Sequence, residues 1–375
     1  MRVKHIGKEK IPVPAIGIGC MGIGGFFAAD TTADVKTLET LRYAFDLGLT
    51  VVDTAEGYAS GHSEELVGKA IAGRRAEVYV ATKVSPEHLS SRDLVSSAEQ
   101  SLKRLSVDQI DLFQVHWPNP KIPLEETMRG LDSLVRSGRI RHIGVCNFSL
   151  KDLKDAEGYL QGGSVAAAQV EYNLFDRSIE KEYLPYCLEH DISVIAYSPL
   201  DQGQICGGPQ TRALLEPIAR RAGCTLGQLA LAWLIEHPGV LAIPKASRAD
   251  HLLLNAAAGE MTLSSDDVAE IDRLTGQNLR EVPVDRIQVV PDDAGQRKVY
   301  RTVEEARANI HGFVPSPMEL AAEMRKGEFL KAVRVRPTAE PSSTWEYELI
   351  EGRIRYWAWV IAFEGQRDIP VLVRA

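Results

Sequence analysis

Between about residue 16 and residue 274, short runs rich in β-branched residues alternate with stretches in which apolar residues recur every three or four positions. The first pattern predicts buried strands and the second predicts amphipathic helices. We expect eight strands, over residues 16–20, 50–54, 78–84, 110–117, 140–147, 167–172, 193–198 and 240–244. We expect a helix in each interval between them, over residues 33–47, 63–72, 91–105, 124–137, 150–160, 181–190 and 226–236. Because strands joined by helices pair in parallel through right-handed crossovers, this order predicts an α/β fold, a (β/α)8 TIM barrel.

An open, doubly wound parallel sheet is the alternative arrangement. A sheet of that kind that binds a dinucleotide carries a GxGxxG turn between its first strand and its first helix. The glycines among residues 17–25 lie instead in a loop that continues to Phe26 and Phe27, and no helix begins at the last of them. The sequence therefore favours the closed barrel.

The alternation stops after about residue 274, where a turn-rich segment begins. We expect the barrel to occupy residues 1–276, a linker to occupy residues 277–282, and a small α+β domain to occupy residues 283–375. This last part contains three of the five tryptophans, which can anchor a core of its own, namely Trp345, Trp357 and Trp359.

Charge and cysteine content narrow the possible classes of function. The formal net charge of −8 disfavours binding to nucleic acid or to anionic membranes. No run approaches the roughly 18 apolar residues of a membrane-spanning helix, and the amino-terminal segment lacks the apolar core of a secretory signal. The five cysteines are widely spaced and form neither a CxxC pair nor a zinc-like cluster. We therefore expect a cytoplasmic protein without a metal, a nucleic-acid partner or a membrane partner.

Four polar residues lie at or just beyond the ends of three successive strands. Asp53, Lys83 and His116 each end a strand, and Tyr58 follows Asp53 by five residues. Active sites of (β/α)8 barrels lie at the carboxyl ends of the strands, and neighbouring strands are about 5 Å apart, so the four side chains can converge. Each alone is more often a satisfied buried polar group. The four together predict a site for acid catalysis.

The chemistry of these side chains is complementary. A tyrosine hydroxyl has an ordinary pKa of about 10, and a nearby ammonium group lowers that pKa. We expect Lys83 to supply this charge and Asp53 to balance the buried lysine. His116 can then hydrogen-bond the same substrate oxygen that Tyr58 protonates.

Longer motifs around these residues resemble those of the aldo-keto reductases. They extend from residue 1 to about residue 280 and include DTAEGYASGHSEELVGKAI, QVHWP, IRHIGVCNFS, QVEYNLFDR, VIAYSPL and AIPKASRADHLLLN. The resemblance implies a catalytic tetrad of Asp53, Tyr58, Lys83 and His116. It also implies transfer of hydride from NADPH to a small aldehyde or ketone, or the reverse oxidation, with Tyr58 as the general acid.

The same resemblance implies a nicotinamide cofactor bound in extended form, usually NADP, with NAD as a possible substitute. The matching positions are Asn147, Gln169, Tyr197, Ser198, Leu200, Lys245, Arg248 and Asn255. In the family, Asn147 and Gln169 match residues that hold the nicotinamide carboxamide, and Tyr197 matches the ring that stacks on the nicotinamide. Cys146 departs from the pattern, because the family commonly has a serine there.

The adenosine end of the cofactor is expected in the loop after the eighth strand. Lys245 and Arg248 are permanent cations that suit a 2′-phosphate, which favours NADP over NAD. Asn255 lies at its family spacing from Lys245. Two positions differ from the family, since Ala246 replaces a serine and His251 replaces an arginine.

The last 90 or so residues resemble the ParB/sulfiredoxin-type domain. The GxxRxxA motif of that domain is present as Gly352, Arg355 and Ala358. A glycine before an arginine-bearing helix offers free N–H groups together with the guanidinium groups of Arg353 and Arg355, and these suit a phosphate. A nucleotide or phosphate ligand is therefore expected at this turn. The alternative is that both arginines pair with local carboxylates such as that of Glu351.

Other activities of domains with this fold are less suitable here. No cysteine follows residue 224, which excludes the thiol chemistry of sulfiredoxin, and acidic and basic residues nearly balance in the last part of the chain. Two classes of function remain. The first is an NADP-dependent aldo-keto reductase, and the second is a slow NADP(H)-sensing protein whose C-terminal domain binds a nucleotide or a phosphorylated ligand.

Overall fold

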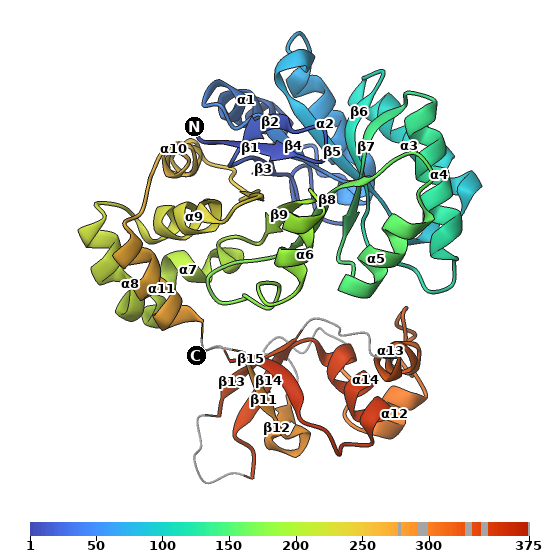
Figure 1. The fold of residues 1–375 in the computed structure, drawn as a ribbon, viewed down its shortest axis with the longest axis vertical. Helices are drawn as coiled ribbons and strands as arrows, with labels where there is room; N and C mark the ends of the chain where they lie inside the picture. Colours follow the sequence, from blue (N-terminus) through green and yellow to red (C-terminus); the bar gives the residue numbers. More distant parts are fainter. Residues whose placement is uncertain (277–278, 291–298, 327–331, 339–343, 374–375) are drawn as a thin grey trace. The chain divides into compact units, whose positions relative to one another are not determined.

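The structure of this chain is a computed structural model that describes residues 1–276, 279–290, 299–326, 332–338 and 344–373 (Figure 1). It contains two compact units. The first comprises Met1–Asn173 and Ile179–Ala269, and the second comprises Leu174–Ser178 and Glu270–Ala375.

The first unit is built on an eight-stranded parallel sheet in which the spatial order of the strands follows the chain. Its strands are β3 (Ile18–Gly19), β4 (Val51–Asp53), β5 (Tyr79–Val84), β6 (Ile110–Val115), β7 (Ile140–Cys146), β8 (Val165–Glu171), β9 (Ser193–Tyr197) and β10 (Val240–Ala242). A parallel bridge joins Ile16 to Ala242, and Gly17 N donates to Ala242 O at 2.8 Å. The two ends of the sheet therefore meet, which confirms the expected (β/α)8 arrangement over the open sheet.

Helices surround this sheet (Figure 1). The seven expected helices are present as α1 (Asp34–Asp46), α2 (His62–Ile71), α3 (Ser91–Leu105), α4 (Leu124–Arg136), α5 (Leu150–Tyr159), α6 (Tyr183–Glu189) and α9 (Leu226–Glu236). Further helices were not predicted from the apolar pattern: α7 (Gln204–Gly207), α8 (Pro209–Arg221), α10 (Ala249–Ala258) and α11 (Ser265–Thr275). Short 3₁₀ turns are η1 (Tyr58–Gly61), η2 (Arg75–Glu77), η3 (Pro86–His88) and η4 (Asp201–Gly203).

A hairpin of β1 (Val3–Ile6) and β2 (Ile11–Pro14) closes the amino end of the barrel. Ile6 and Val13 pack in one cluster with barrel residues such as Leu112. Ser193, the first residue of β9, donates its hydroxyl to His5 O at 2.7 Å. Since this end is filled, a functional site is left to the carboxyl ends of the strands.

The second unit contains a five-stranded mixed sheet with the order β11-β15-β13-β14-β12. Its elements are β11 (Leu279–Val282), η5 (Val284–Arg286), β12 (Ile287–Val289), α12 (Val303–Arg307), α13 (Pro317–Arg325), β13 (Val333–Pro337), β14 (Tyr347–Glu351), α14 (Arg353–Phe363) and β15 (Ile369–Val373). Trp357 and Trp359 lie in its core, whereas Trp345 is exposed, so two of the three expected tryptophan anchors are buried.

The segment expected to be a linker, residues 277–282, overlaps the second sheet. Residues 279–282 form β11 and pair antiparallel with β15. These four residues therefore belong to the second unit, and residues 277 and 278 lie outside the described residues.

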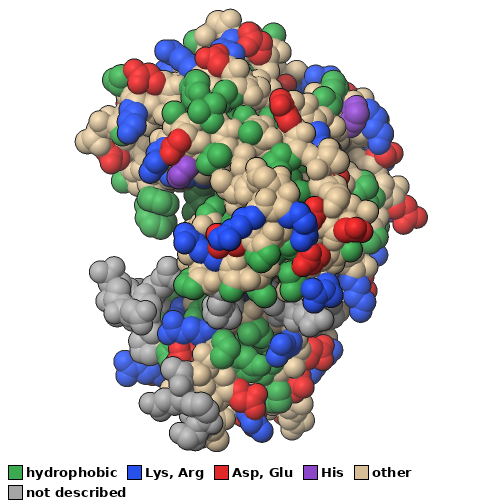
Figure 2. Space-filling view, turned by 90° about the vertical axis from the view of Figure 1, so that its left-hand side faces the viewer, with side chains coloured by type: hydrophobic (Ala, Val, Ile, Leu, Met, Phe, Trp, Pro, Cys, Tyr) green, Lys and Arg blue, Asp and Glu red, His purple; other side chains and the backbone are tan. Residues whose placement is uncertain are grey.

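Among the described residues, no helix combines the length and the apolar character needed to cross a membrane. Side chains of both charge signs are interspersed on the face shown in Figure 2.

Candidate active site

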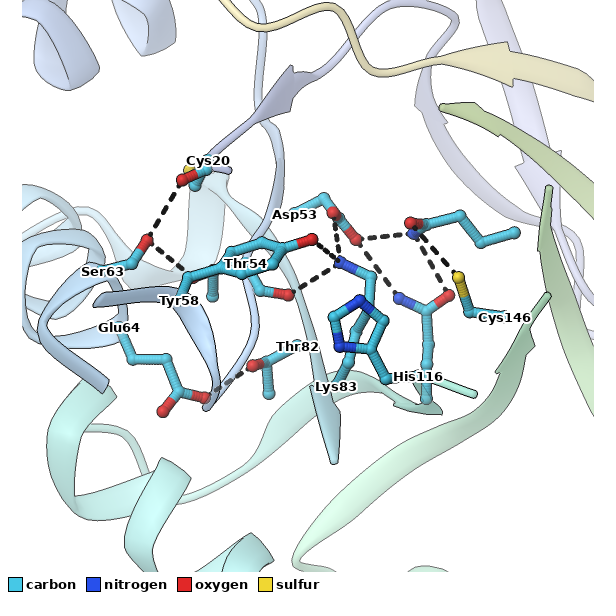
Figure 3. A network of polar contacts seen from close by, with 12 residues as sticks. Cys20, Asp53, Thr54, Tyr58, Ser63, Glu64, Thr82, Lys83, His116 and Cys146 are labelled. Carbon is cyan, nitrogen blue, oxygen red and sulfur yellow. Dashed lines mark hydrogen bonds and ion pairs between the residues drawn. The ribbon is translucent and has the colours of Figure 1, made fainter. Parts of the chain in front are cut away.

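Lys83 occupies the centre of the polar network at the carboxyl end of the barrel (Figure 3). Its side chain is fully buried, and Nζ lies 2.6 Å from Asp53 Oδ2, 3.0 Å from Thr54 O and 3.3 Å from Tyr58 Oη. Three oxygens thus match the three N–H donors of an ammonium group. Side chains alternate along a strand, so the preceding residue, Thr82, points away and bonds a buried carboxylate of α2 at 2.6 Å.

Asp53 is held by two amides in addition to Lys83. Its Oδ1 accepts from Gln169 Nε2 at 2.7 Å and from Gln114 Nε2 at 3.3 Å. Gln169 was expected at the cofactor, and the structure gives its amide a second role beside the carboxylate. Sequence-based prediction does not identify Gln114. The sequence feature that could have indicated Gln114 is a single amide in the otherwise apolar run LFQV at the end of this strand.

Tyr58 and His116 lie edge to face beside this ion pair. Their ring centroids are 5.7 Å apart with an interplanar angle of 78°. Tyr58 lies in η1, where Ala59 and Ser60 adopt left-handed φ values of 51° and 54°. Ala59 N donates to Phe26 O at 3.0 Å, which holds the turn. The structure thus brings together all four residues that the sequence singled out.

The protonation states follow from burial and from the Lys83 charge. Burial alone would lower the pKa of Lys83, but the Asp53 carboxylate outweighs it and the pKa is raised. Burial together with the Lys83 ammonium lowers the pKa of His116 to about 3. At neutral pH the site therefore holds an ammonium group and a neutral imidazole.

The pKa of Tyr58 corrects one expectation. Lys83 acts to lower it, as predicted, but burial of the phenol is the larger effect, and the net pKa lies above its ordinary value. Tyr58 is therefore a protonated phenol at neutral pH. The spacing of residues along the chain does not predict how deeply the Tyr58 phenol is buried.

Residues expected at the nicotinamide form a second network beside the tetrad. Asn147 Oδ1 accepts from Tyr197 Oη at 2.8 Å, and Asn147 Nδ2 donates to His116 O at 3.1 Å. Cys146 Sγ lies 3.1 Å from Asn147 Nδ2 and 3.8 Å from Gln169 Oε1. Burial raises the pKa of Cys146 to about 12, so the thiol stays protonated. Cys146 thus links the side-chain amides of Asn147 and Gln169.

The residues expected next along the cofactor follow β9. Ser198 has a left-handed φ of 47°, and Ser198 O accepts from Asn173 Nδ2 at 3.2 Å. Ser198 and Leu200 are both partly buried. They directly follow Tyr197 and so lie on one continuous segment with it.

The expected adenosine-end residues lie after β10. Lys245 is exposed, and Asn255 is buried in α10. Arg248 is exposed and ion-paired with Asp250, with Nε 3.0 Å from Oδ1. A phosphate at this position would compete with that carboxylate for the guanidinium group.

The residues expected at a phosphate-binding turn of the second unit lie at the start of α14. Gly352 has a φ of 91° and is the N-cap residue of α14. Arg353 donates to Ile350 O at 3.3 Å and to Val290 O at 3.2 Å. Arg355 donates at 3.1 Å to the main-chain carbonyl just before β13. Both guanidinium groups therefore bond main-chain oxygens.

Replacement of His116 by glutamine should reduce the acid sensitivity of folding. The folded imidazole stays neutral down to about pH 3, whereas in the unfolded chain it takes up a proton near pH 6.5. Between these values the unfolded state binds more protons, so stability falls as pH decreases, by at most about 1.4 kcal/mol per pH unit. Urea unfolding from pH 7.5 to pH 4.5 should show a shallower decline for His116→Gln than for the wild type. If the free energy of unfolding falls equally steeply with pH in both proteins, the pKa of His116 is not lowered in the folded state.

Comparison with known proteins shows the family of this chain. The Aldo/keto reductase family model matches residues 15–275. Methylglyoxal reductase YeaE of Escherichia coli (strain K12) is 37% identical over 264 residues, which are 70% of this chain and 91% of that protein.

No metal-binding group of three or more His, Cys, Asp or Glu side chains occurs in the part of the chain that the structure describes.

Two solved structures share the fold. The thermostable aldo-keto reductase Tm1743, solved in complex with the inhibitor epalrestat, is 43% identical with a TM-score of 0.70, and the match covers 73% of this chain and 100% of that one. An aldo/keto reductase from Klebsiella pneumoniae, solved in complex with NADP and acetate, is 40% identical with a TM-score of 0.67, and the match covers 73% and 96% of the two chains. This chain belongs to the aldo/keto reductase family and is an oxidoreductase that acts on carbonyl groups.

Proposed function

We propose that this protein reduces a small aldehyde or ketone with NADPH, or catalyses the reverse oxidation, with Tyr58 as the general acid. One observation carries the proposal. The buried Lys83 ammonium contacts both the Asp53 carboxylate, at 2.6 Å, and the Tyr58 hydroxyl, at 3.3 Å. NADPH, when bound, supplies the hydride that goes to the carbonyl carbon.

The side chains of the site supply the proton and the positive charge that the carbonyl oxygen needs. Tyr58 gives its proton to that oxygen as negative charge develops there, and Lys83 stabilises the phenolate that remains. The neutral imidazole of His116 donates a hydrogen bond to the same oxygen. Solvent then returns a proton to Tyr58, which restores the phenol.

The donor set fits a nicotinamide dinucleotide with a 2′-phosphate. The joined side chains of Asn147, Gln169 and Tyr197 offer amide donors and acceptors and an aromatic face beside the tetrad. Lys245 and Arg248 offer cations after β10. Solved relatives from Klebsiella pneumoniae hold NADP or NADPH, which supports NADP(H) as the cofactor of this chain.

We also propose that the second unit is a ParB/sulfiredoxin-type domain that binds a nucleotide or another phosphate-bearing ligand at the Gly352 turn. The place of Gly352 at the start of α14 supports this, because the first N–H groups of a helix have no partner within the helix and a glycine brings no side chain to cap them. A structural role for Arg353 and Arg355 is the alternative, supported by their bonds to main-chain carbonyls. Glu351, the carboxylate considered above, pairs with Arg334.

A cytoplasmic location is part of the proposal. All five cysteines are free thiols, which suits a reducing compartment. The partner proposed for the barrel is a small carbonyl compound. Slow sensing of NADP(H) is the competing function, and rapid steady-state turnover with aldehydes would exclude it.

Tyr58→Phe should lower kcat by roughly 10²- to 10⁴-fold and leave the Kd for NADPH unchanged, because only the proton donor is lost. Steady-state reduction of a panel of aldehydes and a fluorescence titration measure the two quantities. Tyr79→Phe is a matched control, since Tyr79 is a buried tyrosine whose hydroxyl has no hydrogen-bond partner among the described residues. If Tyr58→Phe turns over as fast as this control, Tyr58 is not the general acid.

Replacing Lys245 and Arg248 by alanine together should weaken NADPH binding at least about tenfold more than NADH binding, because only NADPH carries the 2′-phosphate. Titration with each cofactor gives the comparison. Arg129→Ala with Arg220→Ala makes the same change in net charge at two exposed, ion-paired sites. Equal losses for NADPH and NADH would show that Lys245 and Arg248 do not recognise the phosphate.

Calorimetry of the full-length protein with ATP and with inorganic phosphate tests the second unit. We expect binding of at least one of them, and a loss of that binding when Arg353 and Arg355 are both replaced by alanine. If the wild type binds neither and the double variant is only less stable, the two arginines are structural and the phosphate proposal is wrong.

A further inference from the structure

A carboxylate outside the tetrad connects the two segments that carry Tyr58 and Lys83. Glu56 lies two residues before Tyr58, and its side chain is only 9% exposed. Glu56 N donates to Lys83 O at 3.1 Å. Its Oε1 accepts from the N–H of Ser85, two residues after Lys83, at 2.7 Å. Two hydrogen bonds thus tie the loop after β4 to the end of β5.

Two further groups complete the environment of this carboxylate. The Ser97 hydroxyl, on α3, donates to Oε2, and His88 Nδ1, in η3, lies 2.9 Å from Oε1. Burial alone would raise the pKa of Glu56, but the bonds from Ser97, Ser85 N and His88 outweigh it and lower the pKa. Glu56 therefore remains an anion that accepts from the strand end, from η3 and from α3.

The turn that follows Glu56 needs support from outside. Ala59 and Ser60 adopt left-handed conformations that cost free energy for residues other than glycine. Beyond Tyr58 the turn is held by the main-chain oxygens of Phe26 and Phe27, at 3.0 Å from Ala59 N and 2.8 Å from Ser60 Oγ. Before Tyr58 it is held through Glu56.

The reaction requires the positions of the Tyr58 hydroxyl and the Lys83 ammonium group to be set accurately. Proton transfer and charge stabilisation need the reacting groups within about 0.5 Å of their productive positions. The Tyr58 hydroxyl and Lys83 Nζ are 3.3 Å apart, and Tyr58 lies in η1 whereas Lys83 lies in β5. The bonds made by Glu56 join the loop before η1 to the end of β5.

We propose that Glu56 is a positioning residue for the reaction, which sets the Tyr58 hydroxyl against the Lys83 ammonium without touching the substrate. This inference rests on the proposed role of Tyr58 as the general acid. It predicts that loss of Glu56 slows turnover while cofactor binding and substrate binding stay intact.

The test compares Glu56→Ala, Glu56→Gln and a control in the full chain. Glu56→Ala should lower kcat by about 10- to 100-fold, with KM for the aldehyde and Kd for NADPH nearly unchanged. Glu56→Gln keeps an oxygen that can accept from Ser85 N and an amide that can donate to the Ser97 hydroxyl, so it should recover most of kcat. All assays are made at a temperature where circular dichroism shows each variant to be folded.

Asp132→Ala is the matched control. Asp132 is a buried carboxylate of α4 that accepts from Gly163 N at 3.0 Å and from Gln161 N at 3.3 Å, near the amino end of β8. Its loss should lower the melting temperature and leave kcat unchanged. If folded Glu56→Ala keeps its kcat within about twofold, or loses no more than Asp132→Ala, the positioning role is wrong.

Two further variants test the proposal if Glu56→Ala does not fold and separate it from the proposed role of Tyr58. Should Glu56→Ala fail to fold, Ser97→Ala removes a single donor to Oε2 and should lower kcat by about 2- to 10-fold; an unchanged kcat would overturn the proposal. Tyr58→Phe is measured in parallel. Full turnover of Tyr58→Phe would overturn the acid role itself, whereas an inactive Tyr58→Phe with a fully active Glu56→Ala would overturn only the positioning role.

Discussion

The buried ion pair between Lys83 and Asp53 is the constraint on which the rest of the site depends. A fully buried ammonium group is costly unless it is paired and its remaining donors are satisfied. Asp53 supplies the charge at 2.6 Å, and Asp53 is itself held by the amides of Gln114 and Gln169. Strands β4, β5, β6 and β8 therefore have to meet in one register, which a closed parallel barrel provides.

Burial and the Lys83 charge together set the protonation of the neighbouring groups. Lys83 acts to lower the pKa of both His116 and Tyr58, but burial reinforces that effect for the imidazole and opposes it for the phenol. The outcome is a neutral imidazole beside a protonated phenol, so both groups can donate a hydrogen bond to one oxygen. The sequence indicates which charge acts on Tyr58, but the net direction depends on how deeply the hydroxyl is buried, and only the fold determines that.

Features that depend on residue order along the chain can be predicted from the sequence, whereas features that depend on burial and side-chain conformation cannot. The strands and the helices between them follow from apolar periodicity, and the tetrad follows from strand ends. Helix α8 was missed because Pro217 interrupts its pattern. The role of Gln114 was missed because one amide in an apolar run has no characteristic spacing. The pairing of Arg248 with Asp250, and of Arg353 with main-chain oxygens, depends on side-chain conformation, which spacing does not encode.

The two ends of the barrel illustrate different ways of fixing a structure. At the amino end, the β1–β2 hairpin fills the opening with apolar side chains such as Ile6, and hydrogen bonds such as that from Ser193 to His5 O add to this packing. At the carboxyl end, Tyr58 lies outside the sheet, so strand register cannot set its position. Side-chain to main-chain hydrogen bonds, such as those from Ser85 N to Glu56 and from Ser60 to Phe27 O, take over that task. The position of the Tyr58 hydroxyl is therefore set by the loops, whereas the position of the Lys83–Asp53 ion pair is set by the strands of the barrel.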